Sequence, residues 1–572
     1  MILQALTQYY EDLVEKDQIA RPGWAKAKIS YALCIDTEGE LKQIIPLIEE
    51  TGGKKPQPQQ FNLPAPVKRT MGIASNFLWD NSTYLLGIDA KKNPERSMKC
   101  FKVCKELHHT LLDGKDNDVI RGVLNFFDHW EPSNADNCPV LKDEYDAIIG
   151  GANLLFRVNG EFVHDNNDVR SAWQDYYDHI EGDMRQCLVT GKESVIAAVH
   201  PAIKGVDGAQ STGAAMVSFN ASAFCSYGQD QSYNAPVSKY AAFAYTSALN
   251  HLLSDRKNVQ KIGDTSIVCW AEGAEPQYQE FTYAALFGQE EEGLTEDDIR
   301  DALAKLADGK PVPERGLEAS RPFYILGLSP NSARLSVRFF YRDTFGNLMK
   351  NVNSHHKRME IVRPAYDRFN TIPLWAMLNE TVNPNSKEKN ASPVMAGATA
   401  RAIFTGSMYP AALLEQTMLR IRAEHNINRG KAAIIKAYFL RNQHNDCPKE
   451  VLTVALNEAS TNPAYTLGRL FSLYEAVQED ANPGINATIK DKYFNSAAST
   501  PATIFPFLDN LCQKHLRKIN TSKRIWYEQQ IRKLAEVFGE AYPSRLSLPQ
   551  QGSFNLGYYH QTQKRYEKKE DK

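Results

Sequence analysis

The order of apolar and polar residues divides the chain into a first part with strand patterns and a last part with helix patterns. The segment ISYALCID (29–36) has an apolar residue at every second position, which is typical of a strand with one buried face. The segment 322–346 holds two runs of aromatic and β-branched residues, 323–328 and 334–342, on either side of SPNSA. Because SPNSA consists of turn-forming residues, this pattern predicts a β-hairpin. YLLGID (84–89) and SIVCWA (266–271) are shorter strand candidates.

Helix patterns replace the strand patterns after about residue 395. One apolar stripe at helical spacing consists of Leu414, Met418 and Ile421. A second stripe, in a helix that Gly539 is expected to end, consists of Tyr527, Ile531, Leu534 and Phe538. The sequence therefore predicts an α+β protein, in which a mixed α/β amino-terminal body with β-hairpins is followed by a carboxyl-terminal helical bundle.

Three polar segments predict connections between these parts. The segment 51–66 has too much Pro, Gly and Gln for a regular element, and QEEEGLTEDD (289–298) predicts a surface helix that begins at Thr295. NETVNPNSKEKNASP (379–393) has no apolar period and is the strongest candidate for a domain boundary. We therefore predict one domain over residues 1–385, with room for two subdomains, and a helical domain over residues 395–572.

Length and charge add a hint about partners. A chain of 572 residues exceeds what one hydrophobic core usually supports, so two to four domains are expected. Residues 401–572 hold 24 Lys and Arg against 16 Asp and Glu, a net charge of +8, and residues 1–400 hold 42 against 52, a net charge of −10. A basic final third is one footprint of polyanion binding. A solvated helical surface would give the same numbers, so charge alone leaves both explanations open.

Signatures of enzymes, metal sites and membrane segments are absent from the sequence. The nine cysteines show no zinc spacing, since Cys100 and Cys104 have no second pair, and free thiols indicate a reducing cytoplasm. The sequence has no phosphate loop and no H-E-x-x-H or G-x-S-x-G motif. The pair His164–Asp165 lacks the neighbouring ligands of a two-metal site. The start of the chain does not resemble a signal peptide, and no apolar run approaches the ~20 residues of a membrane span. We expect a cytoplasmic protein without catalytic residues, metal or cofactor, although a nuclease with scattered acidic residues stays an alternative.

Side chains suited to nucleic acid are present. A polar run, 229–234, precedes a helix for which Asn234 is a suitable cap and Pro236 a suitable first-turn residue. Amide side chains pair with adenine, and a loop fixed to a rigid helix start can present them to DNA. The alternative is an ordinary polar surface loop.

Basic residues form further candidate contacts. In the strand 334–342, alternation places Leu335, Val337, Phe339 and Tyr341 on one face. It places Arg334, Arg338 and Arg342 on the other face, where they could follow a nucleic-acid backbone, or simply solubilise the strand. Other basic stretches are 66–77, with Lys68 and Arg69, and RPGWAKAKIS, with Lys26 and Lys28. Such residues would bind phosphates without choosing a sequence.

Four blocks of sequence closely resemble the large subunit of the type I-C CRISPR Cascade complex. The blocks are FLWDNSTYLLGID (77–89), SFNASAFCSYGQDQSYNAPVSKYAAFAYTSALNHLL (218–253), FYILGLSPNSARLSVRFFYRD (323–343) and QGSFNLGYYHQTQKRY (551–566). They run in the same order from the amino-terminal third to the end of the chain.

The resemblance implies a non-catalytic subunit of an RNA-guided antiviral complex. Such a subunit recognises a short PAM in target double-stranded DNA, promotes R-loop formation and supports recruitment of a helicase–nuclease, while pairing with the guide CRISPR RNA supplies the remaining specificity. The implied protein partners are the backbone, guide-processing and small subunits of Cascade. A scaffold that binds single-stranded RNA without reading a PAM stays a further alternative.

The site predictions combine the resemblance with the residue patterns. The residues predicted to read the PAM are Asn76, Gln229, Gln231, Ser232, Tyr233 and Asn234, with Tyr233 as a wedge or stacking group. The residues predicted to bind phosphates are Lys68, Arg69, Lys239, Arg334, Arg338 and Arg342. The residues predicted to line the path of the displaced strand are Lys523, Arg524, Arg532 and Lys533.

Overall fold

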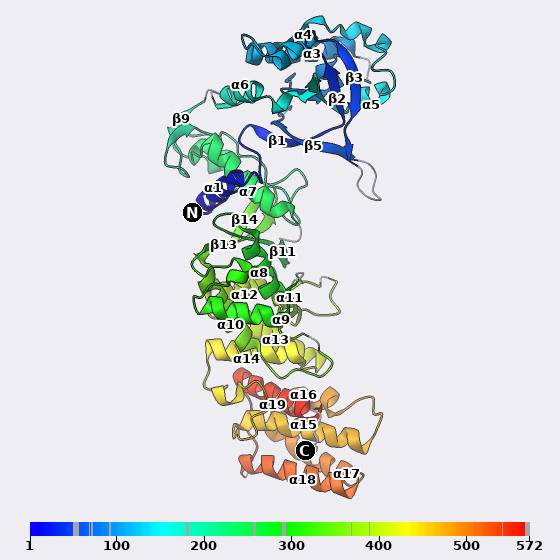
Figure 1. The fold of residues 1–572 in the computed structure, drawn as a ribbon. Helices are drawn as coiled ribbons and strands as arrows, with labels where there is room; N and C mark the ends of the chain where they lie inside the picture. Colours follow the sequence, from blue (N-terminus) through cyan, green and yellow to red (C-terminus); the bar gives the residue numbers. More distant parts are fainter. Residues whose placement is uncertain are drawn as a thin grey trace. The chain divides into compact units, whose positions relative to one another are not determined.

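The computed structural model describes residues 1–49, 57–67, 69, 72–90, 93–178, 182–255, 259–288, 293–367, 369–387, 389–539 and 541–566 (Figure 1). The chain forms two compact units. The amino-terminal unit consists of Tyr10–His200 and Phe219–Ser247, and the carboxyl-terminal unit consists of Met1–Tyr9, Pro201–Ser218 and Ala248–Lys572. The boundary between the units crosses helices α1 (Ile2–Glu15) and α7 (Lys239–Ser254).

A mixed sheet forms the centre of the amino-terminal unit. Its strand order is β3-β2-β7-β6, with β8 beside β7; β2 and β7 are parallel, and the other pairs are antiparallel. The strands are β2 (Tyr31–Ile35), β3 (Leu41–Pro46), β6 (Trp79–Asn81), β7 (Asn153–Val158) and β8 (Glu161–Phe162). The helices of this unit include α2 (Ser82–Leu85), α3 (Pro94–Leu112), α4 (Asp118–His129), α5 (Tyr145–Ile149) and α6 (Asn167–Asp178). Apolar residues of the sheet and of these helices share one buried core.

Two smaller sheets belong to the same unit. One has the order β1-β5-β4 and consists of β1 (Trp24–Ile29), β4 (Ile48–Glu49) and β5 (Gln57–Pro64). The other is the pair β9 (Met184–Gln186) and β10 (Glu193–Val195). Both are antiparallel.

The carboxyl-terminal unit contains an antiparallel sheet with the order β11-β12-β13-β14 and many helices (Figure 1). The strands are β11 (Gln260–Ile262), β12 (Thr265–Ala271), β13 (Pro322–Asn331) and β14 (Arg334–Thr344). The helices include α8 (Pro276–Phe287), α9 (Glu296–Ala307), α10 (Phe345–Met359), α11 (Leu374–Asn379), α12 (Pro393–Thr405), α13 (Ala411–Glu424), α14 (Arg429–Asn442), α15 (Pro463–Ala481), α16 (Ile489–Ser499), α17 (Pro501–Leu516), α18 (Thr521–Ala535) and α19 (Leu548–Tyr566).

These elements confirm the α+β class, with a mixed amino-terminal region and a helical carboxyl-terminal region. The segment 379–393 does not separate the two compact units, because the helices that follow it share a continuous core with the β11–β14 sheet. The Phe339 ring on β14, for example, lies 5.8 Å from the Phe404 ring on α12. Among the described residues, no helix combines the length and apolar character needed to cross a membrane.

Several local predictions are confirmed. Thr295 caps α9 with a reciprocal capping box to Asp298, and β13 and β14 form the expected hairpin. α18 continues as a 3-10 turn to Phe538, and Gly539 follows at a φ of 57°. The strand predicted at 84–89 is wrong, because Asn81 caps a short helix, α2, that contains Tyr84.

Candidate nucleic-acid interface

The polar run before α7 folds into a turn with strained backbone at its tip. Tyr227 and Gly228 have φ angles of 52° and 68°, and the Gln229 N–H donates to the Ser226 carbonyl at 3.0 Å. Two consecutive residues in the left-handed region define a tight turn. Its tip presents Tyr227, whose side chain is 99% exposed.

The Asn234 side chain holds this turn together. Its Oδ1 accepts from the Ser226 N–H at 2.7 Å, and its Nδ2 donates to the carbonyls of Gln229 and Gln231, each at 2.9 Å. Because these contacts use both hydrogens of the amide nitrogen, Asn234 braces the loop and has no donor left for a base.

Contacts from the β9 strand fix the other side of the loop. Arg185 donates to Gln229 Oε1 at 2.6 Å, pairs with Asp183 at 2.7 Å and lies 5.0 Å from the centre of the Tyr233 ring. Ser232 is buried, and its N–H donates to the Ala198 carbonyl at 3.1 Å. Gln229, Tyr233 and Ser232 are therefore engaged within the protein.

A buried thiol supports the base of the loop. Cys187 Sγ accepts hydrogen bonds from the Ser238 N–H at 3.2 Å and the Val189 N–H at 3.4 Å. Burial raises the pKa of the Cys187 thiol, whereas hydrogen bonds from Ser238 and Thr190 lower it. The hydrogen bonds together outweigh burial, so the pKa is about 7, below the ordinary value of a thiol. The sulfur thus satisfies backbone donors at the point where the loop meets the start of α7.

Gln231 is the predicted reader that the structure leaves available. It is exposed, has a φ of 49° and makes no side-chain hydrogen bond among the described residues.

Sequence reasoning missed Tyr227, although an aromatic residue followed by Gly in a polar run is a signal of an exposed residue at the tip of a turn. Lys239 is exposed at the first position of α7.

The predicted reader and clamp at 66–77 are engaged inside the protein. Asn76 is buried and accepts from the Val67 N–H at 3.0 Å. Arg69 forms a two-pronged ion pair with the buried Asp80, and its guanidinium lies 4.0 Å from the centre of the Tyr84 ring. Burial raises the pKa of Asp80, and the Arg69 contact opposes that rise. Lys68 lies outside the described residues.

The arginines of β14 do not share one face. Gly327 pairs with Phe339 and Leu328 pairs with Val337, so Arg338 is an extra residue in the register. Arg334 is opposite Asn331 and Arg342 is opposite Tyr324, which are seven residues apart on β13 and lie on opposite faces.

The predicted alternation of faces along β14 is therefore wrong, because the bulge shifts the register. Val337 is exposed, although the alternation placed it on one face with Leu335, Phe339 and Tyr341, which are buried. Arg338 pairs with Asp264 at 2.9 Å, while Arg342 is exposed.

The basic residues of α18 differ in their partners. Lys523 pairs with Asp480 at 3.3 Å, and Arg524 lies 3.8 Å from Glu528. Arg532 and Lys533 are exposed near the end of the helix. Contact between these residues and a displaced strand remains a prediction.

Within the described ranges, no group of three His, Cys, Asp or Glu residues is arranged to hold a metal ion. His164 and Asp165 face one another at 3.5 Å, and burial lowers the pKa of His164.

The described residues thus present an exposed tyrosine, Tyr227, and an exposed amide, Gln231, on a loop that Asn234 braces. Residues 6–566 match the family described as "CRISPR-associated protein (Cas_Csd1)". Since this match covers nearly the whole chain, the protein belongs to the Cas_Csd1 family of CRISPR-associated proteins. No curated protein matches the chain.

Proposed function

We propose that this chain is the large subunit of a type I-C Cascade complex and that it recognises the PAM in target double-stranded DNA. It acts without catalysis, promotes R-loop formation and supports recruitment of a helicase–nuclease. Its partners are the guide CRISPR RNA, the target DNA and the other Cascade subunits. Family membership supports the CRISPR context, and the resemblance of the four sequence blocks supports the subunit.

The observation that carries the PAM role is the loop 226–234. The Asn234 side chain accepts one hydrogen bond from the loop backbone and donates two to it. Because these bonds fix the backbone, the exposed side chains need little further ordering on binding. Gln231 offers an amide with one acceptor and two donor hydrogens, the set that pairs with adenine in the major groove. Tyr227 offers a free ring that stacks on a base where the duplex opens.

The test is binding of the reconstituted, guide-loaded complex to target duplexes that carry every PAM variant, at fixed salt and without divalent metal. Gln231→Ala should reduce the affinity ratio between the best PAM and the others by about 10-fold or more, which corresponds to the ~1–3 kcal/mol of one good base contact. Tyr227→Ala should slow opening of a closed duplex but not binding to a pre-opened one.

Two exposed residues elsewhere provide matched controls. Gln210→Ala removes another exposed amide, and Tyr366→Ala removes another exposed tyrosine ring. Unchanged PAM discrimination in Gln231→Ala would refute the reading role of the loop. Cleavage of DNA by the purified chain with Mg²⁺ would refute the non-catalytic role and favour a nuclease.

A further inference from the structure

The outer face of the β1–β5 ribbon carries an unusual set of side chains. Lys26 lies directly opposite Asn62, and Lys28 lies directly opposite Gln60, so the four side chains share one face. All four are exposed, whereas Ala27 and Ile29, on the other face of β1, are buried. We call these four residues the ribbon face.

The ribbon face is basic and largely unengaged. Among the described residues, no hydrogen bond or ion pair occupies the side chains of Lys26, Gln60 or Asn62, and Lys28 donates only to Gln57, at 2.9 Å. Same-face residues of one strand lie about 6.6–6.8 Å apart, close to the phosphate spacing of an extended nucleic-acid strand.

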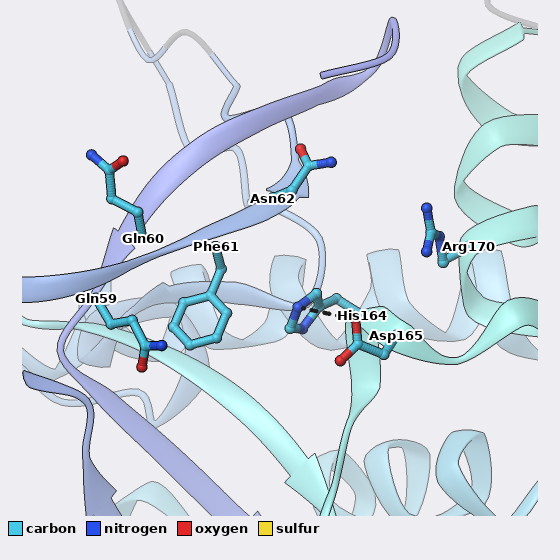
Figure 2. Close-up of a pocket in the computed structure, with 7 residues that line it drawn as sticks. All are labelled: Gln59, Gln60, Phe61, Asn62, His164, Asp165 and Arg170. Atoms are coloured by element: carbon cyan, nitrogen blue, oxygen red, sulfur yellow. Dashed lines mark ion pairs between the residues drawn. The ribbon is translucent and has the colours of Figure 1, made fainter. Parts of the chain in front are cut away.

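A pocket lies along β5 and is lined from both faces of the ribbon: Gln60 and Asn62 belong to the ribbon face, whereas Phe61, paired with Ala27, belongs to the opposite face. Its volume is about 320 Å³, and its walls include Gln60, Phe61, Asn62, His164 and Arg170. Figure 2 shows Phe61 beside His164 on one side of the strand, with Arg170 across the pocket on a helix. The volume is at the lower end of the ~300–1,000 Å³ of ligand sites, which suits one base rather than a duplex.

The chemistry of the walls also fits a nucleotide. The Phe61 and His164 rings meet edge to face with centres 5.6 Å apart, which holds an aromatic surface at the pocket. The Arg170 guanidinium lies 5.4 Å from the centre of the Trp24 ring and, among the described residues, has no ion pair. His164 is 7% exposed, and its buried Nδ1 has no hydrogen-bond partner among the described residues.

We propose that the ribbon face and this pocket together bind a single-stranded nucleic acid. One base enters the pocket beside Phe61, and the amides of Gln60 and Asn62 meet polar groups of the strand. Lys26, Lys28 and Arg170 hold successive phosphates. Asp165 at the pocket wall disfavours a phosphate inside, so the base and not the backbone points inward. This site is separate from the loop 226–234 and does not require that the loop reads a PAM.

The test uses the purified full chain, without guide RNA or other subunits. Its probes are a fluorescent 10-nucleotide oligouridine RNA, the matching oligothymidine DNA and a duplex of equal length, titrated at several KCl concentrations. Lys26→Ala/Lys28→Ala should weaken single-strand binding about 10-fold and lower the slope of log K against log salt by about 1.4, or ~0.7 per phosphate contact. Arg170→Gln should weaken binding in the same direction.

The matched control is Lys102→Ala/Lys115→Ala, which removes the same charge from exposed positions of the same unit. Loss in the ribbon variant but not in the control supports the site, and the tighter of the two single strands identifies RNA or DNA as its source. Equal behaviour of the two variants would overturn the proposal, as would failure of the unmodified chain to bind either strand. Loss of duplex binding alone would also overturn it, because that result assigns the ribbon to a duplex backbone.

Discussion

Gly468→Ala is a sharp test of the packing in the carboxyl-terminal unit. Helices α15 and α19 run side by side (Figure 1) and approach so closely that a Cβ at Gly468 would lie 1.9 Å from the Phe554 carbonyl oxygen. A Cβ at Gly557 would lie 2.0 Å from the Tyr465 carbonyl oxygen. Both obstacles are backbone atoms, so no side-chain rotation relieves the overlap.

Two effects of opposite sign decide the outcome. Alanine favours a helix interior over glycine by about 1 kcal/mol. Against this, the ordinary carbon–oxygen separation is about 3.3 Å, so the helices would have to move apart by roughly 1.4 Å at Gly468 and lose packing along a buried contact. Overpacking of this kind costs about 1–3 kcal/mol and occasionally more. Because the 1.9 Å contact is with a backbone atom, we expect a cost at the upper end of this range, about 3 kcal/mol. After the ~1 kcal/mol gain in helix propensity, the free energy of unfolding should fall by about 2 kcal/mol.

The measurement is urea unfolding of the full chain, together with hydrogen exchange of peptides from α19. Gly397→Ala in α12 is the matched control, since a Cβ at Gly397 meets no atom within 4 Å and should stabilise the protein by up to about 1 kcal/mol. The reasoning is refuted if Gly468→Ala is as stable as the unmodified chain, or if both substitutions shift stability in the same direction.

Three further predictions concern the amino-terminal unit. Asn234→Ala removes three loop hydrogen bonds and should speed amide exchange in residues 226–231 about 10-fold, whereas Gln231→Ala should leave the exchange rates unchanged. Equal rates in the two variants would contradict the conclusion that Asn234, and not Gln231, holds the loop. Asp80→Ala leaves a partly buried guanidinium unpaired and should lower stability by about 3 kcal/mol in urea unfolding, while the exposed Asp116→Ala should change it little; similar effects would argue against the buried pair. Burial lowers the pKa of His108 to about 4, whereas the pKa of a histidine in the unfolded chain is ~6.5. Between these two values the unfolded chain binds a proton that the folded chain does not. The free energy of unfolding should therefore fall by about 3 kcal/mol as the pH falls from about 6.5 to 4. Thermal unfolding against pH should show a shallower decline in His108→Gln, and an unchanged slope would count against this source.

Elements that local rules determine could be predicted from the sequence. Thr295 caps α9 because a Thr followed three residues later by Asp satisfies two backbone donors at once. SPNSA turns the β13–β14 hairpin because its residues tolerate turn geometry. In each case the deciding contacts lie within a few residues of one another.

Elements that distant contacts determine could not be predicted. The run 84–89 is apolar enough for a short strand, and periodicity cannot distinguish that from the buried helical turn that Asn81 begins. The extra residue in β14 likewise has no local signal. The Phe339 ring lies over Gly327 of the partner strand, where a Cβ would come within 2.6 Å of it, and this pairing depends on the whole sheet.

The candidate site shows the same limit in its amide side chains. Asn and Gln carry the same donor and acceptor groups, so composition alone does not separate residues that read DNA from those that brace a loop. Asn has the shorter side chain and readily bonds the backbone of its own segment, as Asn234 does here and as Asn76 does with Val67. Gln reaches further from the backbone, and Gln231 stays exposed, whereas Arg185, 44 residues earlier, engages Gln229. In a tight polar loop, Gln is therefore the better candidate for a reader than Asn, but a distant arginine can still cancel that advantage.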